Sequence, residues 1–375
     1  MEYTQTYGKL KSIFSQGKSE IHIPDSDIRI HNINFRSELP LNDFMNENDR
    51  LISENNTFSY PVFSPKNTKS NKVILLLHGL NERSWIKYLT WASNLADLTD
   101  SYVILFPISF HINRSPDTWK DPREMINLLK NRNSSLGETD MSSFANIALS
   151  SRLTEDPMRF FKSGYQTVAD IVRLASDVKS GNHPVVPKTS NFNIFAYSIG
   201  AFLAEIIMIG NPGNLFSSCK LFIFSGGSVF SNMRGASKFI MDKRAFDRVY
   251  NFYLNDFEKT IKGNSPLTDY LCTSSVGMAF RSMIDLGRFR AFRENMLRKL
   301  RGQIRTITLA RDLIIPSKGV VATLSQFNSK ENLKVWDFPF SYSHENPFPV
   351  LNSPLSKKVD YWFEQLFSEA ALFLA

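Results

Sequence analysis

Cysteine is scarce in this chain of 375 residues, in which Cys219 and Cys272 are the only two. Two cysteines cannot form a disulfide framework, and these two do not lie at a metal-ligand spacing. The simplest interpretation is a pair of buried thiols in a reducing compartment. The sequence also has no other residue set with metal spacing and no glycine-rich phosphate loop. We therefore expect no metal and no cofactor.

Long hydrophobic runs are absent as well. No run reaches about 18 apolar residues, so no transmembrane segment is expected. The first residues, Met1 to Gln5, are polar and lack the hydrophobic region of a signal peptide. These features predict a soluble, cytoplasmic protein. The net charge of +8 is small for the length, so nucleic acid is not an expected partner.

Most of the positive charge is concentrated in one window. Residues 281–305 contain eight basic and two acidic side chains, so the window carries a net charge of +6. At helical spacing, Phe289, Phe292, Met296 and Leu300 fall on one face, with the arginines spread over the rest. Two interpretations stay open: an ordinary solvated basic face, or a face that borders the mouth of a site and favours anionic substrates.

Short apolar runs alternate with helical patterns along most of the chain. Strands are expected at residues 28–33, 58–63, 72–77, 102–107, 192–196, 221–224, 306–310 and 333–336. The proline in 58–63 places that strand near an edge of the sheet. Helices are expected at 84–98, 160–178, 200–209 and 356–372. This alternation predicts an α/β fold with a mostly parallel central sheet and helices on both faces.

Three regions interrupt the alternation and suggest how the chain is divided. Residues 1–20 form a polar N-terminal extension, expected to be frayed or weakly helical. Residues 109–155 are too long for a simple connection, which indicates an ordered insertion or lid within the core at 21–229 and 303–375. Residues 230–302 contain no strand pattern, so we expect them to form a helical cap insertion.

The segment Ala196-Tyr197-Ser198-Ile199-Gly200 joins an expected buried strand to an expected apolar helix. The pattern small-x-Ser-x-Gly in this setting is that of a nucleophile elbow. Such a turn is so sharp that small residues are needed two positions before and after the serine. It exposes the serine hydroxyl and directs the first free N–H groups of the helix toward the same point. Ser198 is therefore the candidate nucleophile.

A serine nucleophile needs a histidine base that is oriented by a carboxylate. His344 follows the last expected strand, and Asp312 follows the one before it. The chain order serine, aspartate, histidine is the order used with this type of elbow. Glu345 is the less favoured acid, because neighbours on one loop point in different directions. His78 is expected to make a structural hydrogen bond.

The four other histidines are expected to be scattered surface or loop residues: His22, His31, His111 and His183. An oxyanion hole requires two backbone N–H groups aimed at the developing negative charge. One candidate is the N–H of Ile199, directly after the nucleophile. The second is the N–H of Leu80, in the loop after the strand at 72–77, which Gly79 allows to fold tightly.

With these landmarks in order, the chain resembles the α/β-hydrolase superfamily. The resemblance covers roughly residues 58–229 and 303–372 and rests on the His78-Gly79 turn, Ser198, Asp312 with Pro316, and His344. Ala196 stands where glycine is commoner, and the insertions match no family of known substrate, so the chain looks like a divergent branch. The resemblance implies the α/β-hydrolase fold and a hydrolytic reaction, but no particular substrate.

The leading functional hypothesis is a serine hydrolase that cleaves an ester or related acyl bond of a small molecule through an acyl-enzyme. A peptidase or amidase on the same scaffold is the first alternative, because the three catalytic residue types do not distinguish these substrates. A non-catalytic binding protein with the same fold is the second alternative. The presence of all three side chains argues against it. The oligomeric state stays open.

Overall fold

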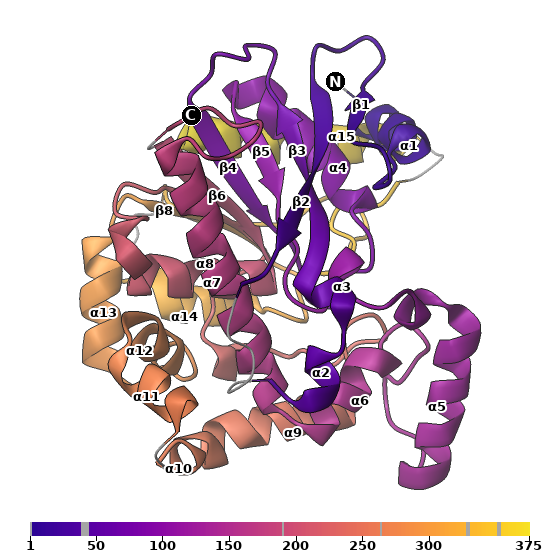
Figure 1. Cartoon of the computed structure of the whole chain (residues 1–375), viewed down its shortest axis with the longest axis vertical. Helices are drawn as coiled ribbons and strands as arrows, with labels where there is room; N and C mark the ends of the chain where they lie inside the picture. Colours follow the sequence, from indigo (N-terminus) through magenta and orange to yellow (C-terminus); the bar gives the residue numbers. More distant parts are fainter. Residues whose placement is uncertain (1, 39–44, 190, 263–264, 328–330, 351–353) are drawn as a thin grey trace.

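A nine-stranded sheet forms the centre of the computed structural model, which describes residues 2–38, 45–189, 191–262, 265–327, 331–350 and 354–375 (Figure 1). The strand order is β1-β2-β3-β5-β4-β6-β7-β8-β9. The first three strands and the β3–β5 pair are antiparallel, and every other pair is parallel. The strands are β1 Glu20–His22, β2 Arg29–Arg36, β3 Thr57–Ser64, β4 Lys72–Leu77, β5 Tyr102–Leu105, β6 Asn191–Tyr197, β7 Leu221–Phe224, β8 Ile304–Leu309 and β9 Leu333–Trp336.

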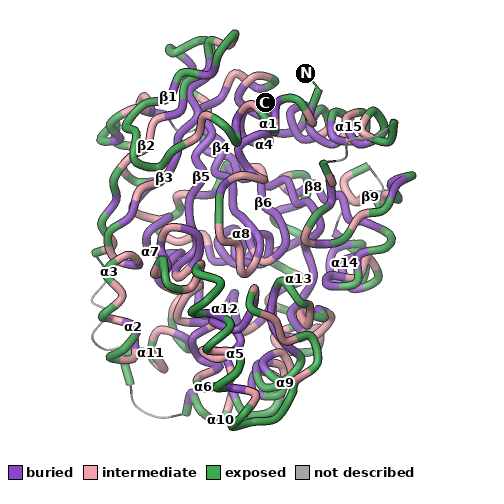
Figure 2. Tube along the Cα trace, turned by 90° about the vertical axis from the view of Figure 1, so that its right-hand side faces the viewer, coloured by how far each residue is buried: buried purple, intermediate pink, exposed green. Residues whose placement is uncertain are grey.

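The central strands are buried on both faces, as their uniformly apolar sequences predict. Along β4, Val73, Leu75 and Leu77 join one hydrophobic layer, whereas Ile74 and Leu76 join the other. The first layer contains α7 (Met158–Ser180) and α8 (Ile199–Gly210), and the second contains α4 (Ile86–Thr99) and α15 (Ser356–Leu374). In Figure 2 the buried residues, in purple, run through β4, β5, β6 and α8. The predicted sheet with helices on both faces is confirmed.

Pro61 lies in β3, which is third from one edge of the sheet rather than at the edge itself. β2 pairs with the whole of β3, but β5 pairs only with Val62 and Phe63. The proline therefore has no ladder partner on the β5 side, which explains how an internal strand accommodates it.

Of the two expectations for the N-terminal segment, a frayed end or a weak helix, the structure shows a helix. Residues Tyr3–Ile13 form helix α1, which lies beside α4 and α15 (Figure 1). Tyr3 stacks on Phe363 with ring centroids 4.3 Å apart, and its hydroxyl donates to the carbonyl oxygen of Phe348 at 3.0 Å. The backbone N–H of Thr4 donates to Asp360 at 2.9 Å. These partners are more than 300 residues away in sequence, so no local pattern could reveal them.

Two of the interrupting segments, 109–155 and 230–302, lie together in the lower part of the molecule in Figure 1. Arg132 of the first segment forms an ion pair of 2.9 Å with buried Asp242 of the second, and the Asp242 N–H donates to Ser150. The first segment contains η2 Ile112–Arg114, η3 Asp117–Lys120, α5 Pro122–Leu136 and α6 Ile147–Glu155. The second contains η5 Phe230–Asn232, α9 Lys243–Asn251, η6 Phe252–Asp256, α10 Phe257–Thr260, α11 Pro266–Thr273, α12 Ser275–Ser282 and α13 Arg290–Lys299.

The remaining helical elements are short. They are α2 Glu47–Arg50 and α3 Ser53–Asn56 before β3, η4 Pro212–Asn214 after α8, and α14 Ser317–Leu324 after β8. Asp49 of α2 is buried and accepts hydrogen bonds from Arg152 of α6 and Arg159 of α7, each at 2.8 Å. The short α2 thus ties the first insertion to the helix layer over the sheet.

Glu205 is a carboxyl group in the middle of the apolar helix α8. It is fully buried, and among the described residues neither of its oxygens has a hydrogen-bond partner. Burial raises the pKa of the Glu205 carboxyl well above its usual range, so the folded protein holds this group in its neutral form. In the unfolded chain the same group ionises at about pH 4.3.

We expect Glu205→Gln to become increasingly stabilising, relative to wild type, as the pH rises from 5 to 8. The pKa of Glu205 is higher in the folded than in the unfolded protein. Its contribution to the free energy of unfolding is therefore fully present below the unfolded-state pKa and is lost as the pH rises toward the folded-state pKa. The difference should grow by up to about 1.4 kcal/mol per pH unit. Urea unfolding at several pH values measures it. The same substitution at exposed Glu364 is the control, and a difference independent of pH would contradict the argument.

Candidate active site

Ser198 stands in a strained turn between β6 and α8, at the carboxyl ends of the parallel strands. Its φ of 59° and ψ of −124° lie outside the regions favoured by residues with a Cβ atom. The helix starts so close to β4 that a Cβ atom on Gly200 would lie 2.7 Å from the carbonyl oxygens of Leu77 and His78. Ala196, buried in β6, is the small residue on the other side of the turn. The strand–turn–helix geometry is that predicted from the sequence.

Gly200→Ala is expected to lower the free energy of unfolding by about 3 kcal/mol or more, because the added methyl group meets backbone that cannot move aside. Gly164→Ala in α7 is the matched control. Its Cβ would meet only Leu203 Cδ1, at an ordinary 3.9 Å. This substitution should raise the free energy of unfolding by about 0.4–1 kcal/mol. Thermal unfolding of both variants measures the difference. Equal melting temperatures would show that the close approach at Gly200 is not needed.

Three side chains from separate loops form one chain of hydrogen bonds. Ser198 Oγ lies 2.6 Å from His344 Nε2, and His344 Nδ1 lies 2.8 Å from Asp312 Oδ2. The other carboxylate oxygen of Asp312 accepts the backbone N–H groups of Ile314 and Ile315, both at 2.9 Å. Ser198, His344 and Asp312 are all buried. With Nδ1–H donated to Asp312, the His344 Nε2 lone pair is directed at the serine hydroxyl.

Glu345, the rival acid, makes different contacts. Its carboxylate accepts a hydrogen bond from the Ser237 hydroxyl at 2.5 Å, and its backbone carbonyl oxygen accepts one from Lys87 Nζ at 3.1 Å. The carboxylate that touches His344 is therefore that of Asp312, and Glu345 links the His344 loop to the second insertion.

Tyr197 supports His344 in a way that sequence analysis did not reveal. Its ring stacks on the imidazole with centroids 5.5 Å apart and planes 19° apart, and its hydroxyl donates to the His344 carbonyl oxygen. Burial raises the pKa of Tyr197 well above its usual range, so the hydroxyl remains a donor. Lys87 Nζ lies 4.8 Å from the ring centroid on Tyr197. Its position directly before Ser198 was the only local signal for this role.

Leu80 and Ile199 carry the two N–H groups predicted to form an oxyanion hole. Both residues line the space next to Ser198, and within the described part of the chain neither N–H has a protein acceptor. His78 holds the Leu80 loop in place. Its Nδ1–H donates to the Gly79 carbonyl at 2.7 Å, and its Nε2 accepts the Ile108 N–H at 2.9 Å. The structural role predicted for His78 is confirmed.

Two of the histidines predicted to be surface or loop residues, His111 and His183, lie in loops but are buried. His183 accepts the N–H groups of Val185 and Val186 and contacts the Tyr60 hydroxyl at 2.9 Å, so the fold satisfies both of its ring nitrogens. His111 is buried near the start of the first insertion, with Nδ1 2.9 Å from the Ser109 carbonyl oxygen. The prediction for Cys272 was also wrong, because this thiol is exposed, whereas Cys219 is buried.

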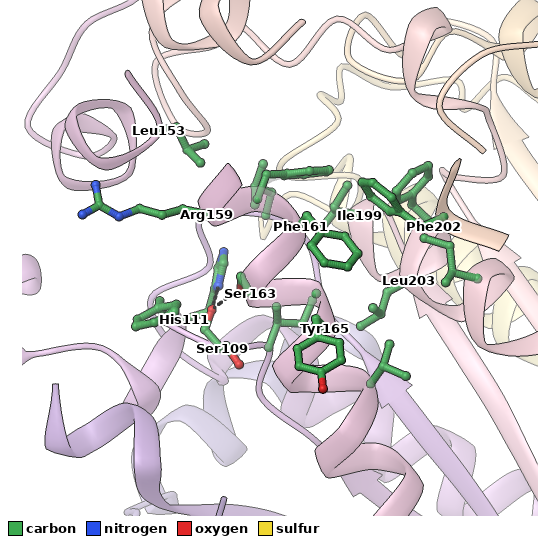
Figure 3. A pocket seen from close by; sticks show the side chains of 18 of the residues that line it. Ser109, His111, Leu153, Arg159, Phe161, Ser163, Tyr165, Ile199, Phe202 and Leu203 are labelled. Carbon is green, nitrogen blue, oxygen red and sulfur yellow. Dashed lines mark hydrogen bonds between the residues drawn. The ribbon is translucent and has the colours of Figure 1, made fainter. Parts of the chain in front are cut away.

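Two cavities border Ser198, and a third adjoins one of them. The largest, of about 490 Å³, is open, has the most polar lining of the three and is bordered by Ser198, His344, Glu82 and Arg83. A second, of about 40 Å³, is apolar and is lined by Ser198, Phe230, Met233, Met241 and Ile315, among others. A third, of about 80 Å³, shares Leu80, Phe160 and Ile199 with the second (Figure 3). It extends between α7, α8 and α12 away from the serine.

The basic window at 281–305 lies apart from these cavities, and none of the three is lined by a described residue of that window. Arg281 pairs with Glu258 at 2.7 Å, and Arg290 pairs with Glu294 at 2.7 Å. Arg293 is buried and donates to backbone carbonyl oxygens around the start of α13. These positions fit the ordinary interpretation of a cap helix with a charged outer face, and they do not support a role at the mouth of the site.

The described residues include no cluster of three or more histidine, cysteine or acidic side chains that could hold a metal ion. Among the helices of the described residues, none is long and apolar enough to cross a membrane.

Comparison with protein families gives a match over most of the chain. The model of a family of unknown function, DUF6051, matches residues 41–375. No curated protein matches the chain in sequence.

Solved structures with a similar arrangement include several esterases. An esterase from Rhizomucor miehei has 11% sequence identity and a TM-score of 0.47, covering 99% of this chain and 90% of its own. Carboxyl esterase 2 from Tuber melanosporum has 10% identity and a TM-score of 0.47, covering 98% of each chain. Vibralactone cyclase has 10% identity and a TM-score of 0.49, covering 99% of this chain and 85% of its own. The structure itself shows an α/β fold with a mostly parallel sheet and a helical insertion between β7 and β8.

Proposed function

We propose that this chain, which belongs to the family of unknown function DUF6051, is a serine hydrolase that cleaves an ester or related acyl bond. The observation that carries the proposal is the pair of hydrogen bonds joining Ser198, His344 and Asp312 at the carboxyl ends of the parallel strands. A serine in a strained turn, a histidine within reach of its hydroxyl and a carboxylate behind that histidine are the parts needed for acyl transfer.

The first half of the reaction forms an acyl-enzyme. His344 Nε2 removes the Ser198 proton while Oγ attacks the carbonyl carbon of the ester. The carbonyl oxygen becomes an oxyanion and accepts hydrogen bonds from the N–H groups of Leu80 and Ile199. Asp312 keeps the imidazole in the reactive tautomer and stabilises its positive charge. The C–O bond then breaks, and His344 gives its proton to the departing alcohol.

The second half regenerates the enzyme. Water enters, His344 Nε2 removes one of its protons, and the resulting hydroxide attacks the acyl carbon. The same two N–H groups hold the second oxyanion. When the bond between the acyl carbon and Ser198 Oγ breaks, the serine recovers a proton from His344 and the carboxylic acid leaves. No cofactor enters either half.

The positions of the cavities suggest where the leaving alcohol and the acyl group of the substrate bind. The leaving alcohol must be within reach of His344, and of the three cavities only the open, polar one is bordered by that residue. The acyl group then extends into the apolar cavities next to Leu80 and Ile199. Their volumes of about 80 and 40 Å³ are below the roughly 150 Å³ of an apolar cavity that holds benzene, so a short acyl group is favoured over a long fatty acyl chain.

Labelling with a fluorophosphonate probe tests the proposal. We expect the wild-type protein to bind one probe molecule covalently, and peptide mapping to find it on Ser198. We also expect hydrolysis of short-chain aryl esters to exceed that of the matched anilides, which separates an esterase from an amidase. A folded protein that takes no label and hydrolyses none of these substrates would overturn the proposal and favour a binding protein.

A further inference from the structure

The apolar cavity of about 80 Å³, which shares Leu80, Phe160 and Ile199 with the cavity beside Ser198, has a polar group at one end. Figure 3 shows Ile199, Phe202 and Leu203 on one side of this cavity and His111 with Arg159 on the other. His111 is 5% exposed, and no described residue makes a hydrogen bond with its Nε2 atom. Most of the remaining lining is hydrophobic and includes Phe161, Val168 and Phe280. An unpartnered nitrogen in such surroundings is costly unless something else pairs with it.

The contacts of His111 determine what Nε2 can bind. Its Nδ1 lies 2.9 Å from the Ser109 carbonyl oxygen, which can only accept, so the proton must be on Nδ1. Burial, reinforced by the charge of Arg152, lowers the pKa of His111 to about 4, so the ring is neutral near pH 7. Nε2 therefore presents a lone pair, which accepts a hydrogen bond but cannot donate one.

The charges at this end of the cavity narrow the class of ligand further. Arg152 and Arg159 both border it, and both are bound to Asp49 at 2.8 Å. Arg159 is also paired with Glu155. Their positive charges disfavour an ammonium group nearby, while their existing partners leave them poorly placed to receive a carboxylate. The lone pair of His111 repels a carboxylate as well. A neutral donor, such as a hydroxyl group, fits these conditions.

We propose that His111 is a specificity residue, whose Nε2 atom accepts a hydrogen bond from a hydroxyl group at the distal end of the substrate's acyl chain. The preferred substrates are then esters of short acids with an apolar body and a terminal hydroxyl group. This inference rests on the proposed function, because it requires the acyl group on Ser198 to extend past Leu80, Phe160 and Ile199, the residues that line both apolar cavities.

A series of nitrophenyl esters tests the inference on the wild-type protein. The acyl chain is lengthened one methylene at a time and ends in a methyl, a hydroxyl or a carboxylate group. At one chain length we expect the hydroxyl ester to exceed its methyl-ended counterpart of equal size by about 10-fold in kcat/KM, the usual value of one buried hydrogen bond. The carboxylate ester should be the poorest of the three at every length.

Two variants identify the acceptor. His111→Phe keeps a ring but removes Nε2, so the ratio of hydroxyl to methyl ester should fall to one or below, whatever happens to the individual rates. Tyr165→Phe is the matched control, since it removes the polar atom of another residue that lines the cavity, and it should keep the wild-type ratio. Fluorophosphonate labelling counts the competent sites in each preparation, so the comparison is confined to folded protein.

The outcomes separate this inference from the proposed function. Hydrolysis of the methyl-ended esters with no preference for hydroxyl at any length overturns the inference alone. A preference for carboxylate, or a ratio that changes with Tyr165→Phe and not with His111→Phe, also overturns it. If the wild-type protein takes no label and hydrolyses no ester, both ideas are overturned together.

Discussion

Ser198→Ala is expected to abolish covalent fluorophosphonate labelling and to lower ester turnover by about 10⁶-fold, the loss seen when the nucleophile of a hydrolytic triad is removed. The Ser198 hydroxyl lies 2.6 Å from His344 Nε2, and among the described residues no other hydroxyl is bonded to that nitrogen. Alanine has the small side chain that the turn requires, so the fold should be retained. Labelling followed by gel fluorescence, with circular dichroism as a check on folding, measures both effects.

Ser225→Ala is the matched control for this substitution. Ser225 directly follows the neighbouring strand β7, is buried and also has a positive φ, of 46°. Among the described residues its hydroxyl has no hydrogen-bond partner and is therefore not bonded to His344, so the variant should still be labelled. Undiminished labelling of Ser198→Ala, or loss of labelling in Ser225→Ala alone, would show that Ser198 is not the nucleophile.

The features that could be predicted from the sequence are those with local causes. A strand covered on both faces needs an uninterrupted apolar run, as in β4, and a strained turn against a neighbouring strand needs residues as small as Ala196 and Gly200. The placement of His344 and Asp312 near Ser198 could be predicted because loops at the carboxyl ends of parallel strands converge on one edge of the sheet. The same reasoning identified His78 as a structural residue.

Other features depend on contacts between distant parts of the chain, so the sequence pattern carried no signal for them. Tyr197 was treated as an ordinary residue within the elbow, although its hydroxyl bonds to a carbonyl 147 positions later. Nothing in the sequence indicated that the two insertions contact each other, which they do through the buried ion pair of Arg132 and Asp242. His111 does lie in a loop, but no sequence pattern showed that it would be buried and would line a cavity together with residues of α6 and α7.

Asp312→Asn is expected to lower kcat by roughly 10⁴-fold, because it fixes His344 in the wrong tautomer. Glu345→Gln, the same chemical change one residue beyond His344, is the matched control and should cost far less. The Glu345 carboxylate contacts Ser237 rather than the imidazole. Steady-state hydrolysis of one aryl ester by both variants measures the ranking. If Glu345→Gln were the more damaging change, the acid of the site would be Glu345.

The local hydrogen bonds indicate why rotation of the asparagine amide cannot restore activity in Asp312→Asn. The N–H groups of Ile314 and Ile315 both donate to Asp312 Oδ1, so this position must hold an oxygen. The amide nitrogen of the variant is then forced to the Oδ2 position, 2.8 Å from His344 Nδ1. A donor there makes Nδ1 an acceptor and moves the imidazole proton to Nε2. That nitrogen could no longer take the Ser198 proton, so attack should fail although every residue keeps its place.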